Sequence, residues 1–503
     1  MAALWLALGS VPSATPRAAA RTPGDGSASS AAARSPRAEV TIVPGQVSRP
    51  ISASFLGLST EYWSLPLYER HLRAFERVLA MLHVPGDRPL ILRIGGDSAD
   101  WTYWDPRART FPRQFFELTP AWLREAATLV RRSGTRVILD LNLAAGSPTM
   151  AARWARAALA ELPRRSLVGF EIGNEPDLYH QELFDRLNAI AASPFASGDY
   201  SAATYARDFS SYAGALSPVV RGVPLLGPAV ANPALDVGWL SSLVARDHRQ
   251  LGMLTAHRYP LSACKPPGSP QYPTVARVLS ERSSAGLAES VKAAVALAHH
   301  AGLDFRLTEL NSVTCGGRQG VSNTFATALW APDALFELAQ AGVDGVNLHI
   351  RVNAINAPFS LCGRSLRARP LLYGLIMFAR ALGPDARLVA VHLREARSLH
   401  LKVWGVRVAG DALHLLVINK GPRTANLDLR VAGSSPATVQ RLLAPSASAQ
   451  SGVTLAGQQL GPDAVWEGAR TVQMTRAEPD GYHLTVPGSS EALVEFGPSA
   501  TAR

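Results

Sequence analysis

Short apolar runs alternate with amphipathic stretches between about residues 55 and 382, and this alternation constrains the fold more than any other feature. Each run has the length of a buried strand, and each stretch between two runs is long enough for the crossover helix of a βαβ unit. Eight such units in one continuous region predict a (β/α)8 barrel. The runs lie at 55–62, 90–96, 136–143, 167–173, 224–230, 253–259, 305–311 and 345–351.

Helical periodicity is clearest at residues 68–82, 121–132 and 286–301, where we expect helices. A doubly wound open sheet is the alternative architecture for such a pattern. That fold would bring a phosphate-binding loop, but neither GxGxxG nor GxxxxGK[ST] follows any of the runs. The pattern therefore favours the α/β class with a closed barrel.

A different texture begins at about residue 387. Short alternating runs separated by Gly, Pro and Ser are typical of an antiparallel β-sandwich, and they occur at 399–408, 413–419, 425–431 and 492–496. The segment 39–52 has the same character, so we expect it to add a strand to that domain. The predicted organisation is a signal-like and low-complexity segment at 1–38, a joining strand at 39–52, the barrel at 53–386 and a β-sandwich at 387–503.

The N-terminal segment combines an apolar run at residues 1–9 with Ala, Ser, Pro and Arg up to about residue 38. It resembles the apolar core and cleavage zone of an export signal, but the basic start of such a signal is missing. We therefore expect a secreted or extracytoplasmic protein, with the start of the signal upstream of residue 1. A low-complexity extension without a targeting role is the alternative. No other stretch approaches the ~20 apolar residues of a membrane span, so we expect none.

The formal net charge of +11 and pI of about 9.9 raise nucleic acid as a partner. Only four of the 50 basic residues are lysine, and the arginines are scattered without a dense basic run or interleaved aromatics. We therefore expect no nucleic-acid partner. An attraction for anionic substrates is still open.

Two predicted strands deliver a glutamate to the same end of the barrel. The fourth run leads into Asn174 and Glu175, and the seventh contains Glu309. Barrel enzymes place catalytic groups at the C-terminal strand ends, and strands four and seven face each other there. A single glutamate after a strand is more often a salt-bridge partner or a loop residue. The matched pair instead indicates glycoside hydrolysis, in which one carboxyl group protonates the leaving oxygen and the other attacks the sugar carbon.

Five sequence blocks, in order along the chain, resemble glycoside hydrolase family 79, the β-glucuronidase and heparanase family. They are FLGLSTEY at 55–62, LRIGGDSADWTYW at 92–104, FEIGNEPDLY at 170–179, AHRYP at 256–260 and LTELNSVTCGG at 307–317. The GNEP element alone marks the wider clan of retaining barrel glycosidases, whereas the five blocks together are specific. The resemblance runs from about residue 40 to the end. It implies Glu175 as acid/base, Glu309 as nucleophile, and an exo-acting retaining enzyme that cleaves β-linked glucuronides without a cofactor.

Further candidate residues surround this pair. Asn174 is placed to bond the sugar 2-hydroxyl, and Tyr259 is a candidate donor that keeps Glu309 ionised. Glu61 and Asp97 are candidates for binding sugar hydroxyls. Asp97 has an alternative role, because a side chain in Gly-Gly-Asp-Ser can order its own turn.

Two histidines end predicted strands, His257 on the sixth and His349 on the eighth. Neither HExxH nor a carboxylate at ligand spacing accompanies them. We therefore expect sugar contact or core packing rather than a metal site.

Three cysteines allow one disulfide. Cys264 and Cys315 follow strands six and seven, whose loops are neighbours at the barrel mouth, and an exported protein meets oxidising conditions. We expect a disulfide between them. Cys362 is the competing partner for Cys315, and three free thiols are the other alternative.

The loop after the eighth strand departs from the family pattern. Family members bind the uronate carboxylate with groups from the loops after strands seven and eight, often including a tyrosine, but residues 349–359 (HIRVNAINAPF) contain none. Asn356, the backbone or Arg351 are the candidate replacements. Two alternatives therefore stay open: a retaining β-glycosidase of other sugar specificity, and a non-catalytic carbohydrate-binding protein on a hydrolase barrel.

Overall fold

The computed structural model describes residues 36–86, 89–104, 116–180, 200–432, 435–498 and 501–502. Most of the signal-like segment predicted at 1–38 lies outside the described residues. No helix among the described ranges is long and apolar enough to cross a membrane.

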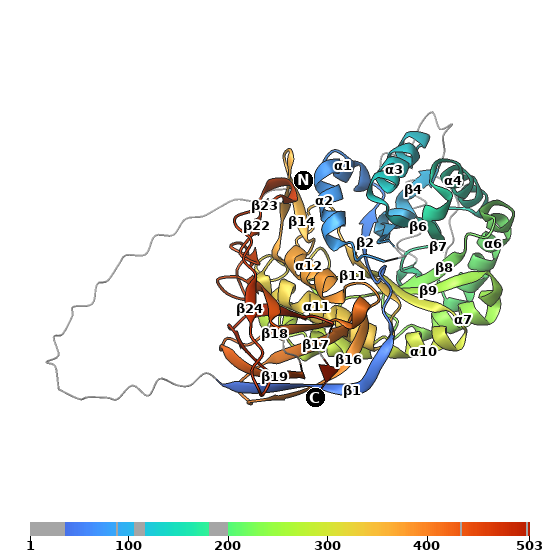
Figure 1. Cartoon of the computed structure of the whole chain (residues 1–503). Coiled ribbons are helices and arrows are strands. Elements are labelled where there is room, and N and C mark those ends of the chain that lie inside the picture. The colour runs from blue at the N-terminus through green and yellow to red at the C-terminus, as the bar shows by residue number, and fades with distance from the viewer. Residues whose placement is uncertain are drawn as a thin grey trace, which may run out of the picture. The chain divides into compact units, whose positions relative to one another are not determined.

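Eight parallel strands close into a barrel, in which the last strand pairs with the first (Figure 1). All eight predicted runs coincide with these strands, so the predicted (β/α)8 barrel is confirmed. In order around the barrel, the strands are β2 (Leu56–Glu61), β3 (Ile91–Gly95), β6 (Arg136–Leu141), β7 (Leu167–Ile172), β8 (Leu225–Val230), β9 (Leu251–Arg258), β11 (Asp304–Leu310) and β13 (Gly345–His349).

Helices cover the outside of the barrel, so strands such as β2, β7 and β8 are buried at every residue. The longer helices are α2 (Leu72–Leu82), α3 (Pro120–Ser133), α4 (Pro148–Glu161), α6 (Ala202–Val220), α7 (Val237–Asp247), α10 (Lys292–His300), α11 (Phe325–Gln340) and α12 (Pro370–Leu382). Shorter ones are α1 (Leu65–Glu69), α8 (Val275–Val278) and α9 (Ala285–Glu289).

Local sequence sets several of the helix starts. The side chains of Thr119, Ser147 and Ser201 each accept a hydrogen bond from a backbone N–H in the first turn of α3, α4 and α6. Proline also occupies the first turn of α3 and α4, where its missing N–H costs nothing.

Two of the three predicted helices are divided. The stretch 68–82 is split between α1 and α2 at residues 70–71, and 286–301 is split between α9 and α10 at residues 290–291. At the second break, Ser290 donates its hydroxyl to the Leu287 carbonyl and accepts from Arg258. Periodicity did not reveal these breaks, because the apolar spacing continues across them.

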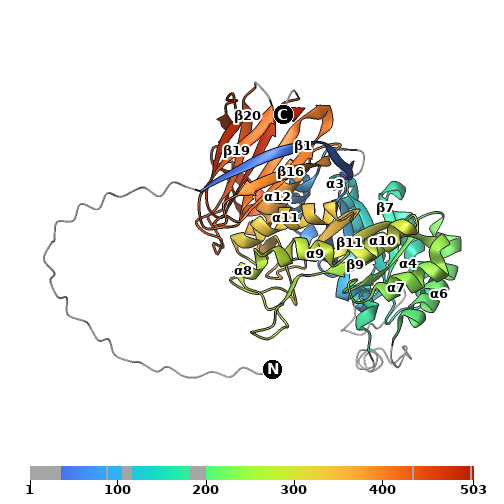
Figure 2. The same cartoon turned by 90° about the horizontal axis from the view of Figure 1, so that it is seen from below.

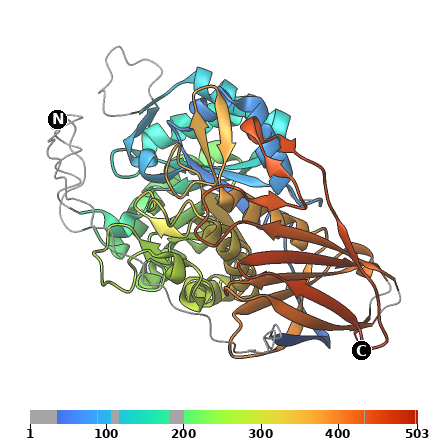
Figure 3. The same ribbon diagram turned by 90° about the vertical axis from the view of Figure 1, so that its left-hand side faces the viewer.

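The C-terminal region forms one sheet of eleven strands, most of them antiparallel (Figure 3). Its main path runs β21 (Thr454–Leu455), β20 (Ala437–Leu443), β26 (Ser490–Phe496), β18 (Leu413–Asn419), β17 (Leu401–Arg407), β16 (Arg387–Glu395), β1 (Arg37–Pro50), β19 (Ala425–Ala432) and β25 (Tyr482–Val486). At its margins, β24 (Gln473–Thr475) pairs with β20 and β27 (Thr501–Ala502) with β19.

Strand β1 comes from the other end of the chain and lies between β16 and β19 (Figure 2). It is antiparallel to β16 but parallel to β19, so the sheet is not purely antiparallel as expected. This insertion supports the proposal that residues 39–52 belong to the C-terminal domain rather than to the barrel.

The C-terminal sheet packs on helices α11 and α12 of the barrel. Along β18, Leu416 and Ile418 join the main core with these helices, while Leu413, Leu415 and Val417 join a separate core within the sheet. Both faces of β18 are therefore buried.

Candidate active site

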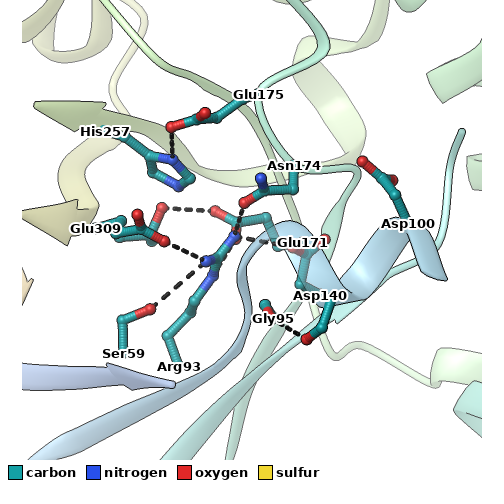
Figure 4. A network of polar contacts seen from close by, with 12 residues as sticks. Ser59, Arg93, Gly95, Asp100, Asp140, Glu171, Asn174, Glu175, His257 and Glu309 are labelled. Atoms are coloured by element: carbon teal, nitrogen blue, oxygen red, sulfur yellow. Dashed lines mark hydrogen bonds and ion pairs between the residues drawn. The ribbon is translucent and has the colours of Figure 1, made fainter. Parts of the chain in front are cut away.

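Glu175 and Glu309 lie close together at the C-terminal end of the barrel (Figure 4). One carboxylate oxygen of each, together with a ring nitrogen of His257, lies within 4.8 Å of the others. Retaining glycosidases hold their two carboxyl groups about 5–5.5 Å apart, whereas inverting enzymes need about 6.5–9.5 Å to admit a water. The geometry therefore supports the predicted catalytic pair and the retaining mode.

The backbone after β7 turns sharply to present Glu175. Gly173 and Glu175 both adopt positive φ, of 78° and 47°, and the Glu175 N–H donates to the Ala229 carbonyl at 3.1 Å. A left-handed non-glycine residue costs about 1–2 kcal/mol, so the surrounding fold must hold it there. The Glu175 carboxylate pairs with His257 Nδ1 at 2.9 Å and is less buried than Glu309.

Donors and positive charge surround Glu309. Tyr259 donates its hydroxyl to one carboxylate oxygen at 2.6 Å, and Arg93 donates to the other at 3.3 Å. Burial by itself would raise the Glu309 pKa, but the charges of His349, His257 and Arg93 and the Tyr259 hydroxyl lower it to about 2. Glu309 is therefore ionised across the ordinary pH range, as a nucleophile must be. Tyr259 makes the contact for which the sequence nominated it.

Arg93 is the centre of a buried charge network that the sequence reasoning missed. It lies on β3, and its side chain is fully buried. Its guanidinium donates to Glu171 and to Asp140, at 2.8 Å each, beneath Glu175 and Glu309 (Figure 4). Burial disfavours the guanidinium charge, but these carboxylates and Glu309 raise the Arg93 pKa. The sequence does carry a sign of this network, since each of three largely apolar strands contains one charged residue between apolar neighbours. A charged residue is tolerated inside a barrel only if a partner of opposite charge meets it there.

Arg93 also orients Asn174. It donates to the Asn174 side-chain oxygen at 3.0 Å. The amide NH2 of Asn174 is thereby left as a donor beside Glu175, as a contact to the sugar 2-hydroxyl requires.

Glu61, Asp97 and His349 form a second group beside Glu309. His349 lies 3.3 Å from Glu309 and 3.4 Å from Glu61, and its ring Nδ1 is 3.1 Å from the Tyr259 hydroxyl. Burial lowers the His349 pKa, but the charges of Glu309, Glu61 and Asp97 outweigh this effect and raise it to about 8. His349 therefore carries a positive charge at neutral pH.

The turn after β3 places Asp97 and fixes Glu61. Gly96 has a φ of 72°, and a Cβ there would lie 2.7 Å from a Glu61 carboxylate oxygen, so the turn requires glycine. The Ser98 N–H donates to Glu61 at 2.9 Å. Asp97 keeps an accessible side chain, yet lost hydration and the charges of Glu61, Glu175 and Glu309 raise its pKa to about 7.

Asn356 has a different role from the predicted one. Its side-chain amide donates to the Val313 carbonyl at 2.7 Å, and its backbone carbonyl accepts from Asn311 at 2.9 Å. Asn356 therefore ties the loop after β13 to the loop after β11, and one of its two amide N–H donors is used there. Arg351, the other candidate, places its guanidinium 5.6 Å from the ring centre of Trp63.

A disulfide joins the loops after β9 and β11. It links Cys264 to Cys315, and Cys362, at the end of β14 (Phe359–Cys362), is a free exposed thiol. Beside it, β10 (Leu261–Ser262) pairs in parallel with β12 (Val313–Thr314). The loop that follows the nucleophile is therefore fastened covalently and by a small sheet.

Among the residues that the structure describes, two groups of side chains are close enough to hold a metal ion. One is Glu175, His257 and Glu309 itself, and the other is the exposed group Glu478, Asp480 and His483. A cation in the first group would occupy both carboxylates, so it would compete with a sugar rather than assist it.

Comparisons with known proteins show what the chain resembles in sequence. The model of the glycosyl hydrolase family 79 C-terminal β domain matches residues 404–493. A curated β-glucuronidase from Aspergillus niger is 24% identical, over 73% of either chain.

The fold also resembles solved structures. A 4-O-α-L-rhamnosyl-β-D-glucuronidase from Fusarium oxysporum 12S matches with a TM-score of 0.73 and 17% identity, over 91% of this chain and 99% of that one. A GH51 arabinofuranosidase from Xanthomonas axonopodis pv. citri matches with a TM-score of 0.66 and 15% identity, over 92% and 100%. The resemblance to glycoside hydrolase family 79 is therefore confirmed, and the chain is a glycoside hydrolase.

Proposed function

We propose that this protein is a retaining β-glycosidase that hydrolyses β-linked glucuronides, with Glu309 as nucleophile and Glu175 as acid/base. The observation that carries the proposal is the approach of the two carboxylates to within 4.8 Å at the barrel mouth. That spacing suits direct attack on a sugar carbon by one carboxylate while the other reaches the glycosidic oxygen.

In the first step, a Glu309 oxygen bonds to the anomeric carbon as the glycosidic C–O bond breaks, and Glu175 transfers its proton to the departing oxygen. In the second step, Glu175 takes a proton from water, the water oxygen attacks the anomeric carbon, and Glu309 leaves as a carboxylate. Two inversions give net retention. Arg93, His349 and Tyr259 stabilise the carboxylate that each cycle regenerates.

Support for a uronate substrate comes from the curated relative named β-glucuronidase and from the loop after β11. Cys315, Gly316 and Gly317 follow one another there with positive φ, and the Gly316 carbonyl accepts from the N–H groups of Ile355 and Asn356. Within the described part of the chain, the N–H groups of Cys315 and Gly316 have no hydrogen-bond partner. Successive backbone N–H groups of this kind form anion-binding concavities. We propose them as the carboxylate donors in place of Asn356.

Hydrolysis of p-nitrophenyl β-D-glucuronide, compared with the β-glucoside and β-galactoside, tests this specificity. We expect kcat/KM for the glucuronide to exceed the others by at least about 100-fold, because donors for a carboxylate would be left unpaired by a neutral hexose. Proton NMR of the first product should show the β-anomer. Equal turnover of neutral glycosides would favour the alternative of another sugar specificity and leave the two-glutamate mechanism in place. Absence of all glycosidase activity would favour the carbohydrate-binding alternative.

We also propose that the protein acts outside the cytoplasm. The Cys264–Cys315 disulfide supports this, since such bonds persist mainly in oxidising compartments.

A further inference from the structure

A cavity lies at the end of the barrel opposite the two glutamates, where the strands begin. Its volume is about 570 Å³. It is lined by residues 49–55, which are the end of β1 and the connection to β2, and by the first residues of β3, β6, β7, β8, β9 and β11. Pockets that bind small molecules in proteins span about 300–1,000 Å³, so this cavity has room for one.

The wall of this cavity is partly apolar. Ile91, Val168 and Leu226 line it and belong to a small core cluster that is separate from the main one. Met253 also lines the cavity and is only partly buried against that cluster. The apolar part of a ligand in this cavity could therefore pack against these side chains.

Arg306 brings a positive charge to the same cavity. This residue of β11 is 2% exposed, and its Nε donates to Asn347 at 2.6 Å while its Nη2 donates to the Ser54 carbonyl at 3.1 Å. Its Nη1 has no hydrogen-bond partner among the described residues. Gly345 leaves room for Nη1, because a Cβ at that position would overlap it.

The guanidinium of Arg306 forms no direct ion pair with a described carboxylate, although the charges of Asp344 and Asp304 act on it from further away. No carboxylate in the described ranges forms an ion pair with it, and at the cavity Asp344 pairs instead with Arg49 and His299. Asp304 lies at the exposed start of β11 and Asp385 is exposed. Burial and the charge of Arg136, which also lines the cavity, lower the Arg306 pKa to about 9 against the opposing effect of Asp344 and Asp304, so the side chain is still charged at neutral pH. A buried charge without a directly bound counter-ion is costly, and an anion hydrogen-bonded to Nη1 would relieve part of that cost.

We propose that this cavity is a binding site for a small organic monocarboxylate. The ligand carboxylate accepts a charge-assisted hydrogen bond from Arg306 Nη1, and its aliphatic or aromatic body packs on Leu226 and Met253. The site lies at the opposite end of the barrel from Glu175 and Glu309, and the proposal does not depend on the proposed hydrolase activity.

Isothermal titration with hexanoate tests the proposal, with hexanamide as the uncharged analogue of the same shape. We expect hexanoate to bind the wild-type protein at least tenfold more tightly than hexanamide. Glu309→Gln should bind hexanoate as the wild type does, since the catalytic site lies at the other end. No binding of hexanoate at millimolar concentration, equal binding of hexanamide, or loss of binding in Glu309→Gln would each overturn the proposal.

Two variants of the cavity, Met253→Trp and Arg306→Met, test its shape and its charge separately. Met253→Trp adds bulk to the cavity wall and leaves the charge of Arg306 in place, and Met474→Trp makes the same exchange at an exposed position on β24. We expect hexanoate binding to be lost in the first variant and kept in the second. Arg306→Met should reduce hexanoate binding to that of hexanamide. If Arg306→Met does not fold, Met253→Trp decides alone, and hexanoate binding that persists in a folded Met253→Trp protein would contradict the site.

Discussion

A single buried guanidinium connects the chemistry of both glutamates. Arg93 donates to Glu309 and also orients Asn174 beside Glu175. Its remaining donors go to Glu171, Asp140 and Ser59, so the proposed nucleophile, Glu309, is held by a charge that is itself paired with other carboxylates. Rigid donors of this kind need no reorganisation as the reaction proceeds.

Substitution of the glutamates separates their roles. Glu309→Gln should lower kcat by several orders of magnitude for every substrate, because no covalent intermediate can form. Glu175→Gln should spare substrates with good leaving groups, such as p-nitrophenyl glycosides, more than alkyl glycosides, which need the proton. Steady-state kinetics on both substrate types checks this. Wild-type activity in either variant would remove that residue from the mechanism.

The raised pKa of His349 predicts that the free energy of unfolding decreases as the pH rises above neutral. Its pKa is raised to about 8 in the folded protein, so its contribution is fully present below the unfolded value of about 6.5 and is lost as pH rises through 8. Asp97 has its pKa raised from about 3.8 to about 7, so the stability that it loses as pH rises is lost between those values, below that window. Urea unfolding from pH 7 to pH 8.5 should show a decline in the wild type that His349→Asn reduces. The same slope in both proteins would show that His349 is not the titrating group.

At the scale of elements, the site depends on two loops that are fastened to each other. The disulfide holds the loop after β11, and the hydrogen bond from Asn356 to Val313 attaches the loop after β13 to it. The positions of the proposed carboxylate donors therefore depend on contacts between loops rather than on either loop alone.

Removal of the disulfide tests this dependence. The Cys264→Ser/Cys315→Ser double variant should lose about 2–4 kcal/mol of unfolding free energy, and KM for the glucuronide should rise more than kcat falls. Cys362→Ser is the matched control, because that thiol is exposed and free, and it should change neither. Denaturant titrations and kinetics measure both quantities. An unchanged KM in the double variant would mean that this loop does not contact the sugar.

At the scale of the whole molecule, ion pairs join the barrel to the C-terminal sheet. Lys420, just after β18, contacts Asp333 of α11 at 2.5 Å with both side chains fully buried. Trp404 of β17 donates to the other Asp333 oxygen at 3.0 Å. Two of the four lysines of the chain, Lys402 and Lys420, lie at this junction and share Glu281.

Loss of one partner of the buried pair should be costly. Lys420→Met leaves Asp333 charged and uncompensated, so we expect about 3–5 kcal/mol of destabilisation. Lys292→Met is the control, because its pair with Glu289 is exposed, and it should change stability by less than about 1 kcal/mol. Urea unfolding followed by tryptophan fluorescence measures the difference. Equal small effects in both variants would show that the junction does not depend on this pair.

The barrel could be predicted from the sequence, because hydrophobic periodicity is a local property and strand ends follow from it. Glu175, Glu309 and Tyr259 could be nominated for the same reason, since each stands at a strand end. The breaks within two predicted helices and the parallel pairing of β1 with β19 could not, because they depend on partners far along the chain.

Tertiary structure alone decided the roles of the charged side chains. Arg93 meets Asp140 and Glu171 across 47 and 78 residues of sequence, and no local pattern specifies which buried charges will face each other inside a barrel. Asn356 likewise met a backbone carbonyl 43 residues away rather than the site. Sequence by itself determined the barrel and the ends of its strands, because burial is set residue by residue along each element. The fold determined which polar groups share one buried space, because a charge or donor there is tolerated only beside a partner that closure of the barrel brings to it.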